Sequence, residues 1–227
     1  MKGRMQMFKE HGFTIWGTYC KCGNECSILQ NKHHPWDNTS FAIKLKCKSC
    51  NTEIIIDKNS AEIFYNNKIY SYFNGIYGKI IDLGCGGGFL SRYLLNQSNI
   101  EKVYGLDVDR ECRKDLSDII RQNKNFKFIN YDIRDINSIF SVNSIDFMVS
   151  RDVFMFIEDT DQYFDNISQI VKKGIRQMGW YIKDNNRMKN KLTPQQIAAE
   201  YTKRGWNVDL KYLDWYKSGY FIKAYKL

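Results

Sequence analysis

Residues 79–88 decide the fold, and they read Lys79-Ile80-Ile81-Asp82-Leu83-Gly84-Cys85-Gly86-Gly87-Gly88. The first five residues form a short apolar run that predicts a buried strand, and the glycines after it predict a tight turn. Phe89–Leu95 then predicts a helix. Glycines in such a turn let the backbone approach a ligand closely and expose amide groups at the start of a helix, where polar and anionic atoms are favoured. The stretch therefore predicts a strand-turn-helix unit that faces a ligand.

The spacing of the glycines separates this turn from a dinucleotide-binding fingerprint. That fingerprint needs G-x-G-x-x-G, and counting from Gly84 the last glycine would fall on Phe89. The pattern that stands here is Asp82-x-Gly84-x-Gly86-x-Gly88, with an acidic residue at the end of the strand.

Three further apolar runs follow in the chain, and each has an acidic residue close behind it. From Gly78 onward such runs alternate with helical stretches, which is typical of a parallel sheet covered by helices. The three runs with their acids are Lys102–Leu106 with Asp107, Phe126–Asn130 with Asp132, and Ser144–Ser150 with Asp152.

In this order, the residues resemble the motifs of the class I S-adenosylmethionine-dependent methyltransferases. The resemblance covers roughly residues 60–227 and implies an α/β fold, a Rossmann-like seven-stranded sheet with helices on both faces. Its last elements would be a strand over 174–183, a helix over 193–204 with a Thr cap, and strands over 206–212 and 219–225. A hairpin at this edge argues against a plain dinucleotide-binding fold.

The same resemblance implies where the cofactor S-adenosyl-L-methionine binds. Asp107 would accept hydrogen bonds from both ribose hydroxyls, and Asp132 would lie near the adenine amino group. Taken singly, each acid reads equally well as an ordinary loop carboxylate, and together at successive strand ends they indicate cofactor binding. The predicted cofactor-binding residues are Asp82, Gly84, Cys85, Gly86, Gly88, Asp107, Val108, Asp132, Ile133 and Ser150.

Methyl transfer from a sulfonium needs a nucleophile placed about 3 Å away and in line with the sulfur, and it needs no covalent intermediate. A hydroxyl acceptor needs a general base, whereas a ring nitrogen does not. Relatives that resemble the loop after residue 150 often carry a His where Phe156 stands, and Phe156 cannot take a proton. Asp152 is the nearest candidate for a catalytic base.

Five of the seven cysteines fall between positions 20 and 50, and this clustering predicts a separate amino-terminal module. Cys47-Lys48-Ser49-Cys50 is a C-x2-C turn between two strand-like stretches, and such a turn aims two thiolates at one zinc ion. The module resembles a zinc ribbon over residues ~13–57, so we expect a structural Zn²⁺. Such a short segment cannot build a sufficient core, so metal binding would supply much of its folding free energy.

Three cysteines compete for the two places of the other pair. Superposing residues 22–25 on 50–53 favours Cys20 and Cys22, and places Cys26 over a strand residue, Ile54. The predicted ligands are therefore Cys20, Cys22, Cys47 and Cys50, with Cys26 as the rival of Cys20. The alternative is a small β module with free thiols.

The methyl acceptor is the least defined part of the prediction. The chain has 34 Lys and Arg against 25 Asp and Glu, a net charge of +9. Between 172 and 191 there are seven cations and a single acid, and the loop over 183–191 should border the ligand crevice. The predicted substrate-binding residues are Arg151, Lys183 and Arg187.

These cations favour an acidic or nucleic-acid acceptor, with RNA ranked first and binding through phosphates and a stacked base. The first alternative is a small molecule, such as a nucleotide-linked sugar or another phosphate-bearing metabolite. The second is a zinc-ribbon adaptor that binds cofactor without turnover. With only Pro35 and Pro194, the chain lacks the Pro-Cys nucleophile of cytosine C5 methylation and the Pro-Pro-aromatic loop usual in exocyclic amine methylation of DNA bases.

The predicted domains are a zinc-ribbon-like module over 1–58 and a methyltransferase domain over 59–227. No apolar run reaches the ~18 residues that cross a bilayer, so no membrane partner is expected. Reduced thiols and the absence of a signal-like start favour a cytoplasmic protein. The sequence leaves the oligomeric state open.

Overall fold

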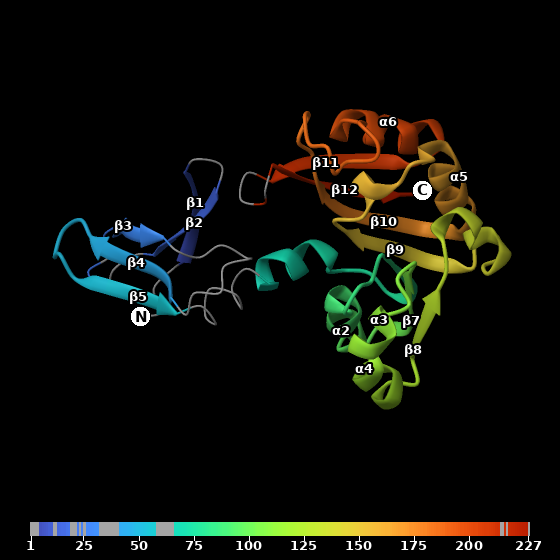
Figure 1. Cartoon of the computed structure of the whole chain (residues 1–227), viewed down its shortest axis with the longest axis horizontal. Coiled ribbons are helices and arrows are strands. Elements are labelled where there is room, and N and C mark those ends of the chain that lie inside the picture. Colours follow the sequence, from blue (N-terminus) through green and yellow to red (C-terminus); the bar gives the residue numbers. More distant parts are fainter. Residues whose placement is uncertain are drawn as a thin grey trace. The chain divides into compact units, whose positions relative to one another are not determined.

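The computed structural model describes residues 5–10, 13–18, 22, 24, 26–31, 41–57, 66–213, 216 and 218–226. The chain divides into two compact units, one comprising 1–71 with 214–218 and the other 72–213 with 219–227. Figure 1 shows the strands and helices of both units. The predicted domain boundary at 58/59 stays a prediction, because residues 58–65 lie outside the described part. Residues 66–70 are helical.

The first unit contains two small antiparallel sheets. One is the hairpin of β1 (Met5–Glu10) and β2 (Phe13–Thr18). The other has three strands in the order β3 (Cys26–Asn31), β4 (Phe41–Cys47) and β5 (Glu53–Asp57). The turn between β4 and β5 carries Asn51 at φ 60°, a left-handed conformation that Asn tolerates. The predicted strands on both sides of Cys47–Cys50 are therefore present.

The second unit contains a mixed sheet of seven strands in the order β11-β12-β10-β9-β6-β7-β8. β12 runs antiparallel to both of its neighbours, and the other pairs are parallel. This is the predicted sheet with its terminal hairpin. The strands are β6 (Gly78–Leu83), β7 (Ile100–Asp107), β8 (Phe126–Asn130), β9 (Ile145–Arg151), β10 (Val171–Trp180), β11 (Asn207–Leu213) and β12 (Gly219–Tyr225).

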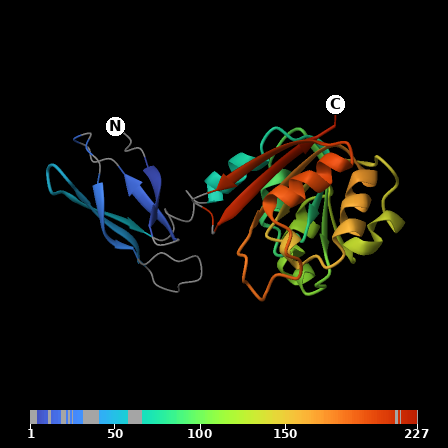
Figure 2. The same cartoon turned by 90° about the horizontal axis from the view of Figure 1, so that it is seen from above.

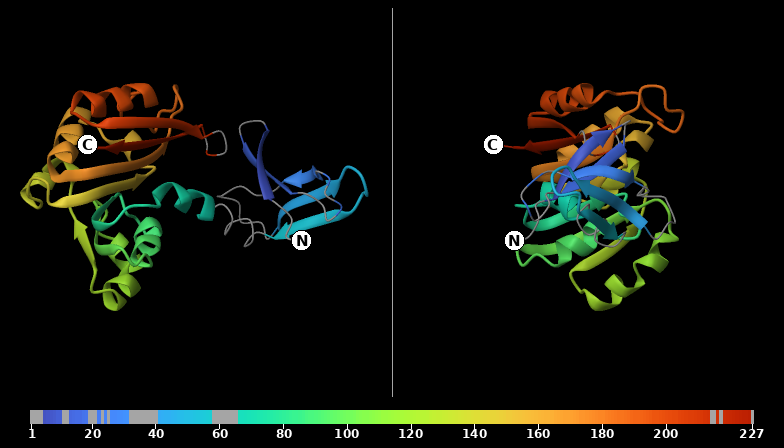
Figure 3. Two further views of the ribbon diagram at one scale, coloured as in Figure 1. Left: turned by 180° about the vertical axis from the view of Figure 1, so that it is seen from behind. Right: turned by 90° about the vertical axis from the view of Figure 1, so that its left-hand side faces the viewer.

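Helices cover both faces of this sheet (Figures 2 and 3). Ile81 and Leu83 of β6 belong to the main core cluster, which they share with residues of α5 and α6. Asp82, whose side chain alternates to the other face, bonds to Ser91 of α2. The α-helices are α2 (Phe89–Leu95), α3 (Cys112–Asp115), α4 (Ser117–Gln122), α5 (Thr160–Ile170) and α6 (Pro194–Lys203), and the 3₁₀ helices are η1 (Ser71–Phe73), η2 (Ile133–Ser138) and η3 (Phe154–Phe156).

The start of α6 shows why the sequence predicted it well. Thr193 accepts a hydrogen bond from the backbone N–H of Gln196, whose side chain accepts one from the backbone N–H of Thr193. This is a capping box, and Pro194 occupies the first helical position, where no donor is needed.

The predicted strand over 174–183 is displaced by three residues. β10 begins at Val171, directly after α5, and ends at Trp180. Lys172 and Lys173 lie within this strand, and both ammonium groups bind Asp146 of β9, at 3.2 and 2.9 Å. These ion pairs neutralise the charged segment that starts the strand. Because β10 ends at Trp180, Lys183 lies in the loop after it.

Candidate functional site

The glycine turn has the conformation that its sequence indicated. Gly84, Gly86 and Gly88 have φ angles of 62°, 48° and 84°, a region that side chains rarely adopt. A Cβ on Gly84 would lie 2.3 Å from a methyl carbon of Val153, and one on Gly88 would lie 2.6 Å from a methyl carbon of Leu116. The turn therefore depends on glycine for both backbone angle and space.

Asp82 lies beneath this turn and is buried. Its carboxylate accepts a hydrogen bond of 2.7 Å from the Ser91 hydroxyl of α2. Burial raises the pKa of Asp82 to about 7, although the bonds from Ser91 and the charge of Arg151 oppose this shift. Asp82 thus joins the end of β6 to α2 from inside the fold.

Asp107, at the end of β7, ties the turn to the neighbouring strand. One carboxylate oxygen accepts the backbone N–H of Gly86 at 2.9 Å, and the other accepts that of Asp109 at 2.9 Å. These bonds fix the carboxylate beside the glycine turn.

Asp132, after β8, caps η2. It accepts hydrogen bonds from the Arg134 guanidinium at 2.7 Å and from the Arg134 backbone N–H at 2.9 Å. These bonds and the charge of Arg134 hold the pKa of Asp132 below its ordinary value. The carboxylate therefore stays ionised at neutral pH.

A cavity of about 740 Å³ lies at the carboxyl ends of β6 to β9. Its volume falls within the range of small-molecule sites, and it lies where the strand order reverses beside β6, the usual ligand position in an open α/β sheet. The lining residues are Leu83, Gly84, Leu106, Asp107, Val108, Tyr131, Asp132, Ile133, Arg134, Asp152, Val153, Phe156, Ile157, Glu158, Asp159 and Gln162.

The cavity brings together six of the predicted site residues. Five of them are predicted cofactor-binding residues and the sixth is the candidate base. They are Gly84, Asp107, Val108, Asp132, Ile133 and Asp152.

The other predicted residues do not line it. Asp82, Cys85 and Ser150 are buried, and the Ser150 hydroxyl has no hydrogen-bond partner among the described residues. Gly86 and Gly88 belong to the same turn and are not among the lining residues. Arg151 lies over the ring of Phe89, with its guanidinium carbon 4.0 Å from the ring centroid.

The sequence reasoning missed the far wall of the cavity, formed by residues 156–159 and Gln162. Phe156 is half exposed, Glu158 is exposed, and Asp159 caps α5 by accepting the backbone N–H of Gln162 at 3.0 Å. The Asp159 cap before a helix was the one local signal that could have located this wall.

The cavity wall is acidic, although the chain as a whole is basic. Among the described lining residues Arg134 is the only cation, and it is already paired with Asp132. The five lining carboxylates are those of Asp107, Asp132, Asp152, Glu158 and Asp159.

The loop over 181–193 is attached to this acidic wall. The Asn190 amide donates to the carbonyls of Phe154 and Ile157, at 2.8 and 2.9 Å. Lys189 adds an ion pair with Glu158 at 3.2 Å. The exposed cations Lys183 and Arg187 belong to this loop and lie outside the cavity lining. The loop therefore borders the cavity, as the sequence predicted, whereas Lys172 and Lys173 are engaged at the opposite end of β10.

Asp152 stands at a strained position on the cavity wall. Its φ is 60°, which is uncommon outside glycine, and its backbone N–H donates to the Met178 carbonyl at 3.0 Å. Observed strain of this kind is often retained at functional sites.

Nearby in the sheet, the side-chain amide of the buried Gln177 accepts hydrogen bonds from the hydroxyls of Tyr163 and Tyr201, and it donates one to Tyr220.

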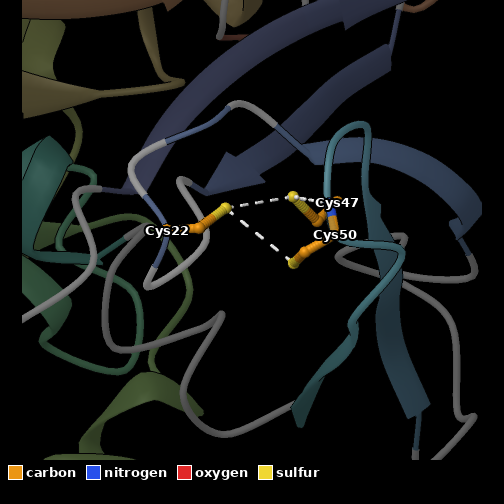
Figure 4. A group of neighbouring side chains, drawn as sticks. All are labelled: Cys22, Cys47 and Cys50. Atoms are coloured by element: carbon orange, nitrogen blue, oxygen red, sulfur yellow. Dashed lines mark hydrogen bonds between the residues drawn. The ribbon is translucent and has the colours of Figure 1, made fainter.

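The first unit contains a cluster of three thiols, Cys22, Cys47 and Cys50 (Figure 4). The Cys22 sulfur lies 3.5 Å from that of Cys47 and 3.8 Å from that of Cys50. Backbone N–H groups of Ser49 and Cys50 point at the Cys47 sulfur, at 3.4 and 3.5 Å. The predicted ligand Cys20 lies outside the described residues, and of Cys26 only the backbone position in β3 is described.

Part of this chain is similar in sequence to known proteins. Residues 81–176 match a family model described as a methyltransferase domain. The malonyl-[acyl-carrier protein] O-methyltransferase 2 of Ilyobacter polytropus is 27% identical over 95 residues, which are 42% of this chain and 36% of that protein. The chain thus matches only about a third of this curated relative's length.

Two solved structures share the fold. An S-adenosylmethionine-dependent methyltransferase of Aquifex aeolicus gives a TM-score of 0.58 at 18% identity, covering 75% of this chain and 94% of that one. The complex of the Haloferax volcanii Trm112 methyltransferase activator with a methyltransferase gives 0.60 at 14%, covering 74% and 92%. These two structures share the fold of the second unit, within which residues 81–176 match the methyltransferase domain model. None of the described helices is long and apolar enough to span a bilayer.

Proposed function

We propose that the protein is an S-adenosylmethionine-dependent methyltransferase that binds its cofactor in the cavity at the ends of β6 to β9. The observation that carries this proposal is the arrangement of Asp107, Asp132 and Asp152 around one cavity, beside a glycine turn. The three acids lie at or just after the ends of three different strands, so the fold rather than local sequence brings them together.

The residues present fit this cofactor. Asp107 offers carboxylate oxygens to vicinal ribose hydroxyls, and its bond from Gly86 fixes its orientation. Val108 is two-thirds exposed and Ile133 lines the same cavity, so both offer apolar surface to a purine ring. Gly84 is exposed and lines the cavity, so its backbone is available for close approach of the ligand. These are the roles we propose for the residues, with Asp82 and Ser91 supporting the turn from below.

When bound, the cofactor supplies a methyl group on a sulfonium, which is already reactive toward nucleophiles. The task of this chain is to place the acceptor in line with that methyl group and to exclude water. Phe156 and Ile157 supply apolar surface for this purpose. Asp152 is the group on the wall that we propose as base for a hydroxyl acceptor, and a ring nitrogen would need none.

The charges around the cavity limit which methyl acceptors can bind there. A phosphate inside the cavity would face five carboxylates, whereas outside it would meet the loop that carries Lys183 and Arg187. We propose an acceptor whose reacting end is uncharged and whose remaining part is anionic. A base within RNA fits this description, and so does a phosphate-bearing metabolite. By its name, the 27% identical relative acts on a malonyl group attached to a carrier protein, which supports an acceptor other than nucleic acid.

Transfer of labelled methyl groups from S-adenosylmethionine into separated RNA, protein and metabolite fractions tests the activity. Incorporation into RNA that falls steeply with added salt supports the nucleic-acid acceptor, and incorporation into metabolites with weak salt dependence supports the small one. Asp107→Ala serves as the inactive control. Cofactor binding without label in any fraction would support the non-catalytic adaptor instead.

We also propose that the first unit binds a structural Zn²⁺ through Cys22, Cys47 and Cys50. Zinc–sulfur bonds of about 2.3 Å place tetrahedral sulfurs about 3.8 Å apart, close to the 3.5 and 3.8 Å found here. A fourth ligand, from Cys20 or Cys26, would close the site and leave the metal no catalytic position. Metal analysis of the purified chain tests the proposal, and a metal-free folded chain would refute it.

A further inference from the structure

The three-thiol cluster of Cys22, Cys47 and Cys50 supplies three corners of a tetrahedron. Among side chains that the structure describes, no other Cys, His, Asp or Glu belongs to this group. A tetrahedral zinc site needs a fourth ligand. The sequence offers Cys20 and Cys26 as rivals, with His33 and His34 as weaker candidates.

The backbone register of β3 and β4 separates the two. Cys26 is the first residue of β3 and pairs directly with Cys47, the last residue of β4. Opposite residues in an antiparallel pair have Cα atoms about 4.5–5.5 Å apart and share one face of the sheet. That separation lies within the range across which two cysteines can form a disulfide. The backbone thus places Cys26 within reach of a metal bound by Cys47.

The spacing along the chain agrees with this register. Three residues separate Cys22 from Cys26, which lies within the usual two to four between paired zinc ligands. A single residue separates Cys20 from Cys22, which lies outside that range. The superposition of the two turns had disfavoured Cys26 because it fell on a strand residue. Cys47 is itself a strand residue, so this objection loses its force.

We propose that Cys26 is the fourth zinc ligand, so that the metal joins the beginning of β3 to the end of β4. This inference rests on the zinc site proposed above. The metal would then cross-link two adjacent strands at one end of the three-stranded sheet and fix the β4–β5 turn beside it. Cys20 is left as a thiol outside the site.

The test compares Cys20→Ser and Cys26→Ser in the whole chain, with Cys22→Ser as the positive control for loss of a ligand. The readouts are zinc per chain by mass spectrometry of the metal and the thiolate-to-cobalt absorption band after Co²⁺ substitution. We expect wild type and Cys20→Ser to bind about one zinc per chain. Cys26→Ser should lose zinc affinity by more than about tenfold, because even second-sphere changes cost that much, and its cobalt band should weaken.

A measurement on the unmutated chain covers the case in which Cys26→Ser fails to fold. Alkylation of the zinc-loaded protein, followed by peptide mass spectrometry, should modify Cys20 readily and Cys26 only after a chelator is added. The opposite order would overturn the assignment, as would zinc loss in Cys20→Ser or full zinc retention in Cys26→Ser. A folded wild type without zinc would overturn the zinc proposal itself and this inference with it.

Discussion

Replacing Asp82 by Asn should make the protein's stability less dependent on pH. In the folded chain the pKa of Asp82 is raised from 3.8 to about 7, chiefly by burial. The folded state therefore keeps this proton across a pH range in which the unfolded state releases it. Wild-type stability should fall as the pH rises from about 4 to about 7, and Asp82→Asn should lack this fall.

The size of this stability difference follows from the pKa shift of Asp82. A difference of about three pKa units at 1.36 kcal/mol each gives about 4 kcal/mol. Relative to wild type, Asp82→Asn should gain stability progressively with pH, by an amount of this order between pH 4 and pH 8. The Asn side-chain oxygen can still accept the hydrogen bond from Ser91.

Urea denaturation at several pH values, followed by the helical circular dichroism signal, measures this difference. Helices α2 to α6 belong to the second unit, so the signal reports on it. Asp118→Asn is the matched control, because the pKa of Asp118 is lowered by Arg92 to about 2 and its carboxylate stays ionised above pH 5. A constant difference between Asp82→Asn and wild type from pH 5 to pH 8 would refute the burial argument.

Three further substitutions test separate parts of the site. Asp107→Ala should weaken S-adenosylhomocysteine binding by about tenfold or more in calorimetry, since hydrogen bonds to a charged group contribute about 1.5–3 kcal/mol; unchanged affinity would remove Asp107 from the site. Gly84→Ala should cost about 1–3 kcal/mol of stability because its Cβ would meet Val153 at 2.3 Å. Gly87→Ala has its nearest contact at 3.8 Å, and an equal loss there would contradict the reasoning. Tyr201→Phe should cost about 1 kcal/mol through its lost bond to Gln177, and exposed Tyr212→Phe should cost almost nothing in the same denaturation assay.

The order of elements in the second unit was predictable because local signals agreed with the global fold. The strand, glycine turn and helix over 79–95 are encoded within 17 residues, and the start of α6 carries its own capping box. The acids after β7 and β8 were found because a parallel sheet places its strand ends at one edge.

Features that depend on partners distant in sequence were not predictable. The start of β10 depends on Asp146, which lies more than 25 residues before Lys172 and Lys173. Asp82 lies inside the fold rather than on the cavity wall, because strand alternation turns it toward α2. No sequence motif indicated the acidic far wall at Glu158 and Asp159, and the net charge of +9 suggested a basic site instead. The proposal that Cys26 is a fourth ligand likewise required the register of β3 and β4.

The most direct test is calorimetric titration of the folded, zinc-supplied chain with S-adenosylhomocysteine. The account predicts saturable binding at one site per chain, which Asp107→Ala weakens and Gly87→Ala leaves unchanged. A folded chain that takes up neither this nucleoside nor S-adenosylmethionine would contradict the proposed cofactor site and the activity built on it.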